Sequence, residues 1–236
     1  MNDNEFFKKM VRYIPGRLTI GILNFLPIIL LTKLLEPEQY GQYKIVFIAC
    51  TFIMIFSTSW ISQAIIRFWH SFIDKKILYT TATLATLIIN IVTFSIIFII
   101  NLFWQLIDNY LLVAAMLLFF SSPVFNLNTS IYRNMELLKK FNQVEFIRIF
   151  GNIIGILVLV PMFNIYGALV GIGISFFIVN LLSWGNFHKF LSIKKENIEF
   201  KTLKELFVYG FPLVLTMFSS VIISSSDQFL LGVFQG

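Results

Sequence analysis

Long apolar runs separated by short polar clusters fill the sequence from about residue 14 onward. No Asp, Glu, Lys or Arg occurs from Ile77 to Ile107 or from Asn109 to Tyr132, and the uncharged run from Ile149 to Phe187 is 39 residues long. Roughly 20 apolar residues in a helix cross a bilayer core about 30 Å thick. The pattern therefore predicts an all-α, polytopic membrane protein.

The run from Ile149 to Phe187 is too long for one span, and it contains the segment PMFNIYG at residues 161–167. Pro161, Asn164 and Gly167 are residues typical of turns, so we divide the run there. This division gives about seven transmembrane helices of bilayer-crossing length. Their expected ranges are 14–35, 43–66, 77–107, 110–132, 144–162, 166–187 and a seventh span within 208–236.

Basic residues fall on one side of this topology. Of the 18 Lys and Arg residues, all except Lys33 and Lys44 lie before the first span or around the connections after the second, fourth and sixth spans. Because cytoplasmic segments carry the excess of Lys and Arg, the N-terminus is expected to be cytoplasmic. The stretch LTKLLEPEQYGQY, residues 31–43, is then the outer hairpin, in which Pro37 and Gly41 are expected to turn the chain.

The same pattern predicts the domain organisation. Residues 1–188 are expected to form a six-span N-terminal bundle, and the polar residues 189–207 a cytoplasmic interfacial linker. Residues 208–236 would open a second bundle that is incomplete in this chain. Two small-residue repeats, Gly151-x-x-x-Gly155 and Gly167-x-x-x-Gly171, predict close packing faces in the fifth and sixth spans.

Composition supports the membrane assignment and narrows the function. The chain is 58% hydrophobic and only 13% charged, with a mean hydropathy of +0.84, whereas soluble domains typically carry about 25% charged residues. The net charge of +6 is explained by the basic residues that gather on one side of the membrane topology, so no nucleic-acid partner is expected. With one cysteine and two widely separated histidines, the chain is not expected to hold a metal site. Because it contains no catalytic motif, we expect it to be no enzyme and to need no cofactor.

Three segments carry a family resemblance. L-x-K-L-L-E-P-E-Q-Y-G-Q-Y at 31–43, SQAIIRFW at 62–69 and the stretch YGFPLVLTMFSS…SSSDQFLLGVFQG at 209–236 follow one another in the expected order and spacing. In this arrangement the chain resembles the Wzx-like, O-antigen-type flippases for lipid-linked oligosaccharides in the MATE/MOP superfamily. The resemblance covers the N-terminal half of such a protein.

The resemblance implies a location, a function and partners. It implies a multi-pass protein of the bacterial cytoplasmic (inner) membrane that flips undecaprenyl-pyrophosphate-linked oligosaccharide by alternating access, for O-antigen or capsule synthesis. The implied partners are the lipid bilayer, the undecaprenyl-linked saccharide, and the polysaccharide polymerase with its chain-length machinery. Two alternatives stay open: an ion-coupled small-molecule exporter of the same superfamily, and a truncated fragment that transports nothing.

An anionic pyrophosphate headgroup that crosses a membrane needs cations and hydrogen-bond donors along its path. Arginine suits phosphate because its planar fork donates two hydrogen bonds at once. An ordinary anchoring role at the lipid headgroups is the alternative for each arginine. The substrate-binding candidates are Arg17, Arg67, Arg133 and Arg148, together with Asn24 in the first span.

Asp227 is a candidate of a different kind. It lies within the predicted seventh span, where an ionised side chain is costly unless it has a function or a partner. We interpret it as a cavity acid that couples transport to H⁺ or Na⁺, or that pairs with a cavity arginine. A structural pairing with a basic residue, or a shallower position in the membrane, is the alternative.

Overall fold

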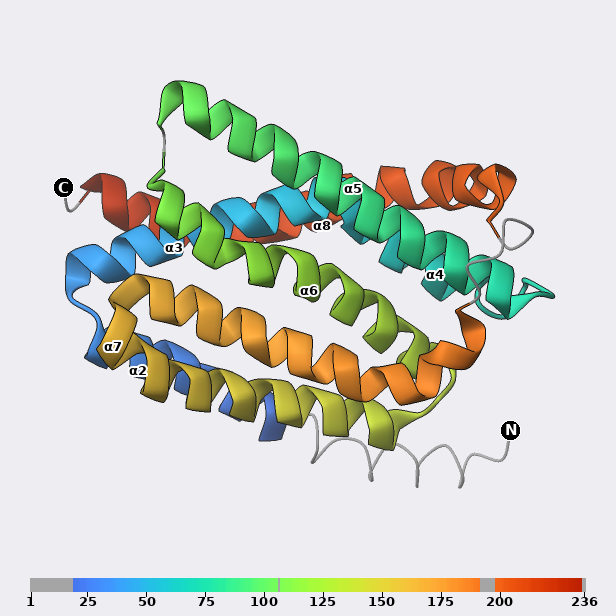
Figure 1. Ribbon diagram of the computed structural model, residues 1–236, viewed down its shortest axis with the longest axis horizontal. Helices are drawn as coiled ribbons and strands as arrows, with labels where there is room; N and C mark the ends of the chain where they lie inside the picture. Colours follow the sequence, from blue (N-terminus) through green and yellow to red (C-terminus); the bar gives the residue numbers. More distant parts are fainter. Residues whose placement is uncertain (1–18, 106, 192–197, 235–236) are drawn as a thin grey trace.

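The protein is helical throughout the part of the chain that the structure describes. In this computed structural model the described residues are 19–105, 107–191 and 198–234, with side chains described as far as residue 220. These ranges contain helices, turns and bends but no β-strand, which confirms the predicted all-α class (Figure 1). The described elements are α2 (Phe25–Leu34), α3 (Pro37–Met54), the π-helix η1 (Ile55–Ser59), α4 (Trp60–Phe68), α5 (Lys75–Trp104), α6 (Asn109–Asn134), α7 (Leu138–Phe187), the 3-10 helix η2 (His188–Phe190) and α8 (Phe200–Phe234).

Four stretches of the described residues are long and apolar enough to cross a membrane. They are Pro37–Phe68, Lys75–Trp104, Asn109–Asn134 and Leu138–Phe190, and a shorter apolar helix covers Thr19–Leu34. The stretch Leu138–Phe190, at 53 residues, far exceeds the roughly 20 residues that one crossing needs. The polytopic membrane fold is therefore confirmed, while the count of seven spans stays a prediction.

Asn164 divides α7 into two arms that run side by side in opposite directions (Figure 1). Its backbone angles are φ 49° and ψ −128°, a conformation with positive φ for which Asn is enriched several-fold among non-glycine residues. Asn164 lies at the centre of the segment 161–167 in which the sequence predicts a turn. Pro161, by contrast, remains inside the helix.

Glycines bring the two arms of α7 into backbone contact. A Cβ atom added to Gly155 would lie 2.8 Å from Cα of Gly171, and one added to Gly151 would lie 2.9 Å from Oγ of Ser175. Gly167 packs even more tightly, since an added Cβ would lie closer still to the carbonyl oxygen of Leu159. The close packing predicted from the two glycine repeats is confirmed, and Gly167 serves this packing.

The connection between α2 and α3 is shorter than the sequence predicts. Only Leu35 and Glu36 separate the two helices, and Pro37 occupies the first turn of α3, where its missing N–H costs nothing. Gly41 lies inside α3 and does not turn the chain, which corrects the prediction for this residue. The second long helix thus starts at Pro37, before the start of the predicted span at Tyr43.

The connections of the bundle gather at two ends (Figure 1). The first end contains Glu36, Asp108 and Asn164, and the hydroxyl of Tyr166 there donates a 2.6 Å hydrogen bond to Asp108. The second end contains the connections that follow α4, α6 and η2. We call the second the basic end, because most of the described basic residues lie on it or beside it: Arg67, Lys75, Lys76, Arg133, Lys139, Lys140, Lys189, Lys201 and Lys204.

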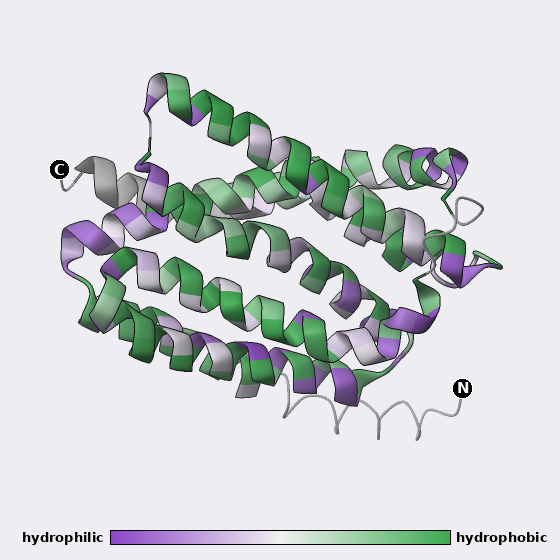
Figure 2. Cartoon of the chain, in the orientation of Figure 1, coloured by the Kyte–Doolittle hydropathy of each residue, from purple (hydrophilic) through white to green (hydrophobic). Residues whose placement is uncertain are grey.

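Most of the helical ribbon is hydrophobic (Figure 2). Many large apolar side chains are exposed, and several polar ones are buried. On α5, for example, Ile88 and Ile91 are more than half exposed, whereas Asn90 between them is fully buried. Buried polar residues also include Asn128 on α6 and Asn152 on α7. This distribution fits a surrounding of lipid, in which polar groups must find partners inside the protein.

The π-helix η1 interrupts the second long helix next to the point in sequence, Trp60, at which α8 packs against that helix. In η1 the carbonyl of Ser57 accepts a 2.8 Å hydrogen bond from the indole N–H of Trp60, which helps satisfy the irregular backbone. Gly210 of α8 lies directly against the backbone carbonyl of Trp60, with no room for a side chain. The absence of a Cβ at Gly210 therefore sets the spacing between α8 and α4.

Replacing Gly155 by alanine is expected to destabilise the protein. The new Cβ meets backbone atoms of Gly171, and such overpacking costs about 1–3 kcal/mol. Gly185, near the end of the same helix, has open space around its Cα, so Gly185→Ala is the matched control for the intrinsic helix preference of alanine. Thermal unfolding in detergent should give a lower Tm for Gly155→Ala and an unchanged or higher Tm for Gly185→Ala. Equal Tm values would contradict the tight contact.

The membrane orientation is testable with thiol labelling. In a chain whose single cysteine, Cys50, is replaced by alanine, Glu38→Cys at the first end and Lys139→Cys at the basic end provide two exposed sites. Because basic segments stay cytoplasmic, a membrane-impermeant reagent applied to intact cells should label position 38 and spare position 139. The opposite result would invert the topology.

Candidate functional site

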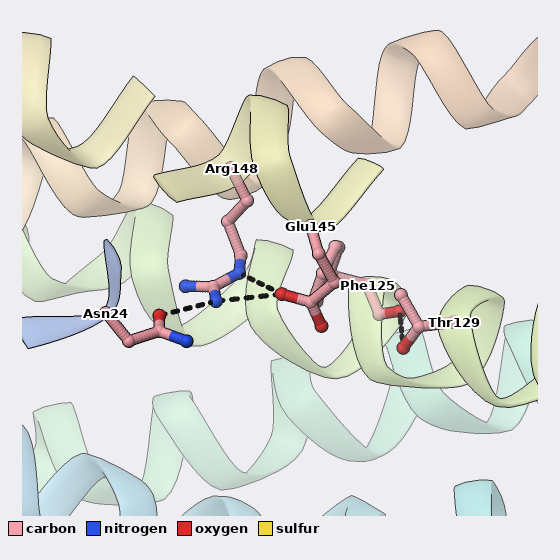
Figure 3. Close-up of polar contacts among 5 residues, drawn as sticks. All are labelled: Asn24, Phe125, Thr129, Glu145 and Arg148. Atoms are coloured by element: carbon pink, nitrogen blue, oxygen red, sulfur yellow. Dashed lines mark hydrogen bonds and ion pairs between the residues drawn. The ribbon is translucent and has the colours of Figure 1, made fainter. Parts of the chain in front are cut away.

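Among the described residues, Arg148 is the centre of a polar cluster that joins two of the predicted site residues (Figure 3). Its guanidinium donates to the carboxylate oxygen Oε2 of Glu145 through Nε at 3.0 Å and through Nη2 at 2.8 Å. Nη2 also donates to the side-chain oxygen of Asn24 at 3.1 Å. The side chains of Arg148 and Glu145 are only 14% and 16% exposed. Two predicted candidates, Asn24 and Arg148, are therefore in direct contact.

Two aromatic rings flank the guanidinium. The central carbon Cζ of Arg148 lies 5.7 Å from the ring centroid of Phe125 on α6 and 5.4 Å from that of Phe176 on the second arm of α7. The two rings meet edge to face at 5.1 Å. A cation beside aromatic rings at this distance is attracted to their faces, and the rings also limit its freedom to move. The arginine is thus held in one position before any ligand binds.

The hydrogen-bond pattern leaves part of the guanidinium available. Arginine has five N–H donors, and the contacts above use those on Nε and Nη2. Nη1 donates to no described residue, so its two N–H groups remain for a ligand. Glu145 balances the charge of Arg148, which lowers the cost of placing the cation at a poorly hydrated position.

Asn24 reaches Arg148 from an irregular turn of the first helix, where its N–H still donates to the carbonyl of Ile20 at 3.0 Å. Residues 19–23 are helical and α2 begins at Phe25, with Asn24 between them as a turn residue. Pro27 lies three residues further on and has no N–H, so it cannot donate to the carbonyl of Leu23. One helical hydrogen bond is therefore missing beside Asn24.

The backbone carbonyl of Phe125 accepts a hydrogen bond from a threonine one turn further along α6. The hydroxyl of Thr129 donates to the carbonyl of Phe125 at 2.9 Å, one turn along α6 (Figure 3). Pro123 interrupts the helical ladder of α6 at this level. A side-chain bond of this kind and a proline inside a helix are both features that bend helices.

The other predicted arginines do not join this cluster through any described contact. Arg133 donates to the hydroxyl of Ser130 at 3.2 Å and lies over the ring of Phe141 at 5.8 Å. Arg67 is exposed and forms no hydrogen bond or ion pair with a described residue. Arg17 lies outside the described residues, and Asp227 lies outside the described side chains. Their proposed roles remain predictions.

Three residues of the cluster were not predicted from the sequence. Glu145 could have been found, because Glu and Arg three residues apart lie on the same face of a helix. Phe125 and Phe176 carry no such signal among the 28 phenylalanines of the chain. Only the packing of α6 against the two arms of α7 brings their rings to Arg148.

A second polar network lies on α5, α6 and α7 towards the basic end. The hydroxyl of Tyr79 donates to Asn128 at 3.0 Å, and the amide of Asn186 donates to the hydroxyl of Tyr132 at 2.9 Å. Lys140 donates to the side-chain oxygen of Asn186. The ring of Phe187 packs against both tyrosines. These contacts tie the helices together, and they contain no group of acidic, His or Cys residues that could hold a metal among the described residues.

Comparison with known proteins assigns the family. The family model described as "Polysaccharide biosynthesis protein" matches residues 7–236, which is nearly the whole chain. The chain belongs to this polysaccharide biosynthesis protein family. No curated protein sequence matches it.

Solved structures show the fold of this family member. A MOP superfamily transporter from Pyrococcus furiosus matches with 19% identity and a TM-score of 0.65, over 90% of this chain and 53% of the other. An outward-facing multidrug resistance transporter of the MATE family matches with 18% identity and a TM-score of 0.66, over 90% and 53%. A MATE protein in complex with Br-NRF matches with 21% identity and a TM-score of 0.66, over 96% and 58%. The chain thus has the MATE/MOP fold and spans little more than half the length of these structures.

The interaction between Glu145 and Arg148 can be measured by a double-mutant cycle. With the variants Glu145→Gln, Arg148→Gln and both together, we expect a coupling energy of about 1–3 kcal/mol in the free energy of unfolding, because the pair is largely buried and its hydrogen bonds involve charged groups. An exposed pair on a helix surface contributes only about 0.3–0.5 kcal/mol. A coupling in that lower range would contradict the held, pre-positioned arginine.

Proposed function

We propose that this chain forms the N-terminal bundle of a transporter that flips a lipid-linked saccharide, and that Arg148 binds the phosphate of the cargo. The membership in the polysaccharide biosynthesis protein family and the MATE/MOP fold support the transporter assignment. Undecaprenyl pyrophosphate is the carrier lipid implied by the sequence resemblance. The cargo would enter from the basic end, which we propose to be cytoplasmic.

The observation that carries the proposal is the geometry of Arg148. Its guanidinium is fixed by Glu145 and Asn24 and flanked by two phenylalanine rings, while the two N–H groups on Nη1 have no described partner. A phosphate oxygen that accepts from Nη1 would form a short, charge-assisted hydrogen bond in a poorly hydrated site. Fixing the arginine in advance reduces the entropy that binding would otherwise cost.

The alternative, an exporter of small organic cations on the same fold, is less well supported. Recognition of a cation would require acidic side chains with unbalanced negative charge. In the described cluster the acid is Glu145, whose Oε2 accepts two hydrogen bonds from Arg148, whereas the N–H donors on Nη1 have no described partner and suit an anion. Coupling to H⁺ or Na⁺ through Asp227 remains part of the proposal for either cargo.

Removing the guanidinium of Arg148 is expected to weaken cargo binding. For Arg148→Ala in the intact protein we expect the Kd of an undecaprenyl-pyrophosphate-linked saccharide to rise about 10- to 100-fold, the loss of one or two hydrogen bonds to a charged group. Arg148→Lys should recover only part of this loss, because an ammonium group lacks the planar fork. Equilibrium binding to the purified protein measures both values.

Two controls separate binding from folding. Lys139→Ala removes an exposed charge from the same helix and should leave the Kd unchanged. A thermal unfolding curve of each variant in detergent shows whether the bundle is intact. Wild-type affinity in a folded Arg148→Ala variant would overturn the assignment of Arg148.

A further inference from the structure

A second cationic site lies at the basic end, where η2 packs against the beginning of α5. A wide-open surface cavity of about 470 Å³ there is lined by Asp74, Lys75, Lys76, Lys189 and Phe190. The hydroxyl of Thr80 donates to the carbonyl of Phe190 at 3.2 Å, and the ring of Trp69 meets that of Phe190 at 5.7 Å. Segments more than 100 residues apart in the sequence are thereby fixed side by side.

The three lysines of this cavity have different roles. Lys75 donates to the carbonyls of Trp69 and Phe72, the latter at 2.7 Å, and so closes the turn after α4. The ammonium groups of Lys76 and Lys189 are exposed and form no hydrogen bond or ion pair with described residues. Lys189 lies 5.1 Å from the ring centroid of Phe190. Two ammonium groups are therefore available to a ligand.

The one acid of the cavity does not cancel this positive charge. Asp74 caps the N-terminus of α5, where its Oδ1 accepts a 2.8 Å hydrogen bond from the backbone N–H of Lys76. Three ammonium groups against one carboxylate leave an excess of positive charge in the cavity. The start of α5 adds the partial positive charge of a helix N-terminus. An anion is favoured, and the ammonium headgroup of a zwitterionic lipid is disfavoured.

The position of the cavity relates it to the membrane surface. It lies where α4 ends at Phe68 and α5 begins at Lys75, and both belong to stretches apolar enough to cross the bilayer. Ile73 on the connecting turn is fully exposed, at 101% of its reference area. A charged cavity with an exposed isoleucine at its rim suits the level at which headgroups meet acyl chains. Further along α5, exposed Ile88 and Ile91 offer an apolar surface to such chains.

We propose that this cavity binds the phosphodiester headgroup of an anionic phospholipid, such as phosphatidylglycerol, through Lys76 and Lys189. The bound lipid would join the beginning of α5 to η2 and so stabilise the basic end of the bundle. This site shares no residue with the cluster around Arg148, and the inference does not depend on what the protein transports.

Fluorescence quenching by brominated lipid tests the proposal. The full chain, with Trp60, Trp104 and Trp184 replaced by phenylalanine, keeps Trp69 as the reporter beside the cavity. In nanodiscs of phosphatidylcholine with increasing brominated phosphatidylglycerol, Trp69 should be quenched at low fractions of the anionic lipid. In Lys76→Gln/Lys189→Gln the apparent affinity should fall about 30-fold, as expected for the loss of two lysine charges near the surface.

A matched variant and a competition decide what binds. Lys139→Gln/Lys201→Gln removes two exposed charges from the same end without touching the cavity and should quench as the wild type does. An equal loss of apparent affinity for the anionic lipid in this variant would mean that the lipid is attracted by the general surface charge, and it would overturn the proposed site. Displacement of the lipid by inorganic phosphate alone would show a free-anion site and overturn the lipid assignment. Wild-type quenching in Lys76→Gln/Lys189→Gln would overturn it as well.

Discussion

The backbone contact between the two arms of α7 is the constraint on which the site depends. Gly155 and Gly171 meet without room for a Cβ, so the first arm, which carries Arg148, lies directly beside the second, which carries Phe176. α6 packs against α7 and supplies Phe125 as the second ring. A wider spacing of the arms would separate the guanidinium of Arg148 from the ring of Phe176.

The bilayer explains why so much polarity lies inside this bundle. Hydrocarbon offers no hydrogen-bond partners, so hydroxyls along the helices bond to carbonyls one turn back, as Thr86 does to Ala82 and Ser175 to Gly171. Asn180 instead reaches across to the carbonyl of Ser121 on α6. Fully buried Asn90 has no partner for either amide atom among the described residues. The interior is therefore not a sealed apolar core, and such an interior suits a protein that moves a polar group through lipid.

The sequence predicted the features that depend on long local patterns. Uncharged runs revealed the helices, because a bilayer imposes length and hydrophobicity on each crossing. The prediction of the turn near residues 31–43 was less accurate, because a proline such as Pro37 marks the start of a helix as readily as a turn. In the polar cluster, the sequence singled out Asn24 and Arg148 as polar residues in apolar surroundings, and their role in binding stays a prediction. Phe125 and Phe176 were not, because only tertiary packing distinguishes them from the other phenylalanines.

Glu145 gives the proposed phosphate site a property that a lone arginine would lack. An unpaired guanidinium in a dry site would bind a phosphate tightly and release it slowly. A transporter must both bind its cargo and release it readily. With Glu145 at 2.8 Å, an incoming phosphate meets a cation whose charge is already balanced, and the carboxylate repels it. Binding is then limited to the donors on Nη1, and the ion pair keeps the arginine in place when the cargo leaves. In the proposed transport cycle, the pairing of Arg148 with Glu145 thus favours turnover over affinity.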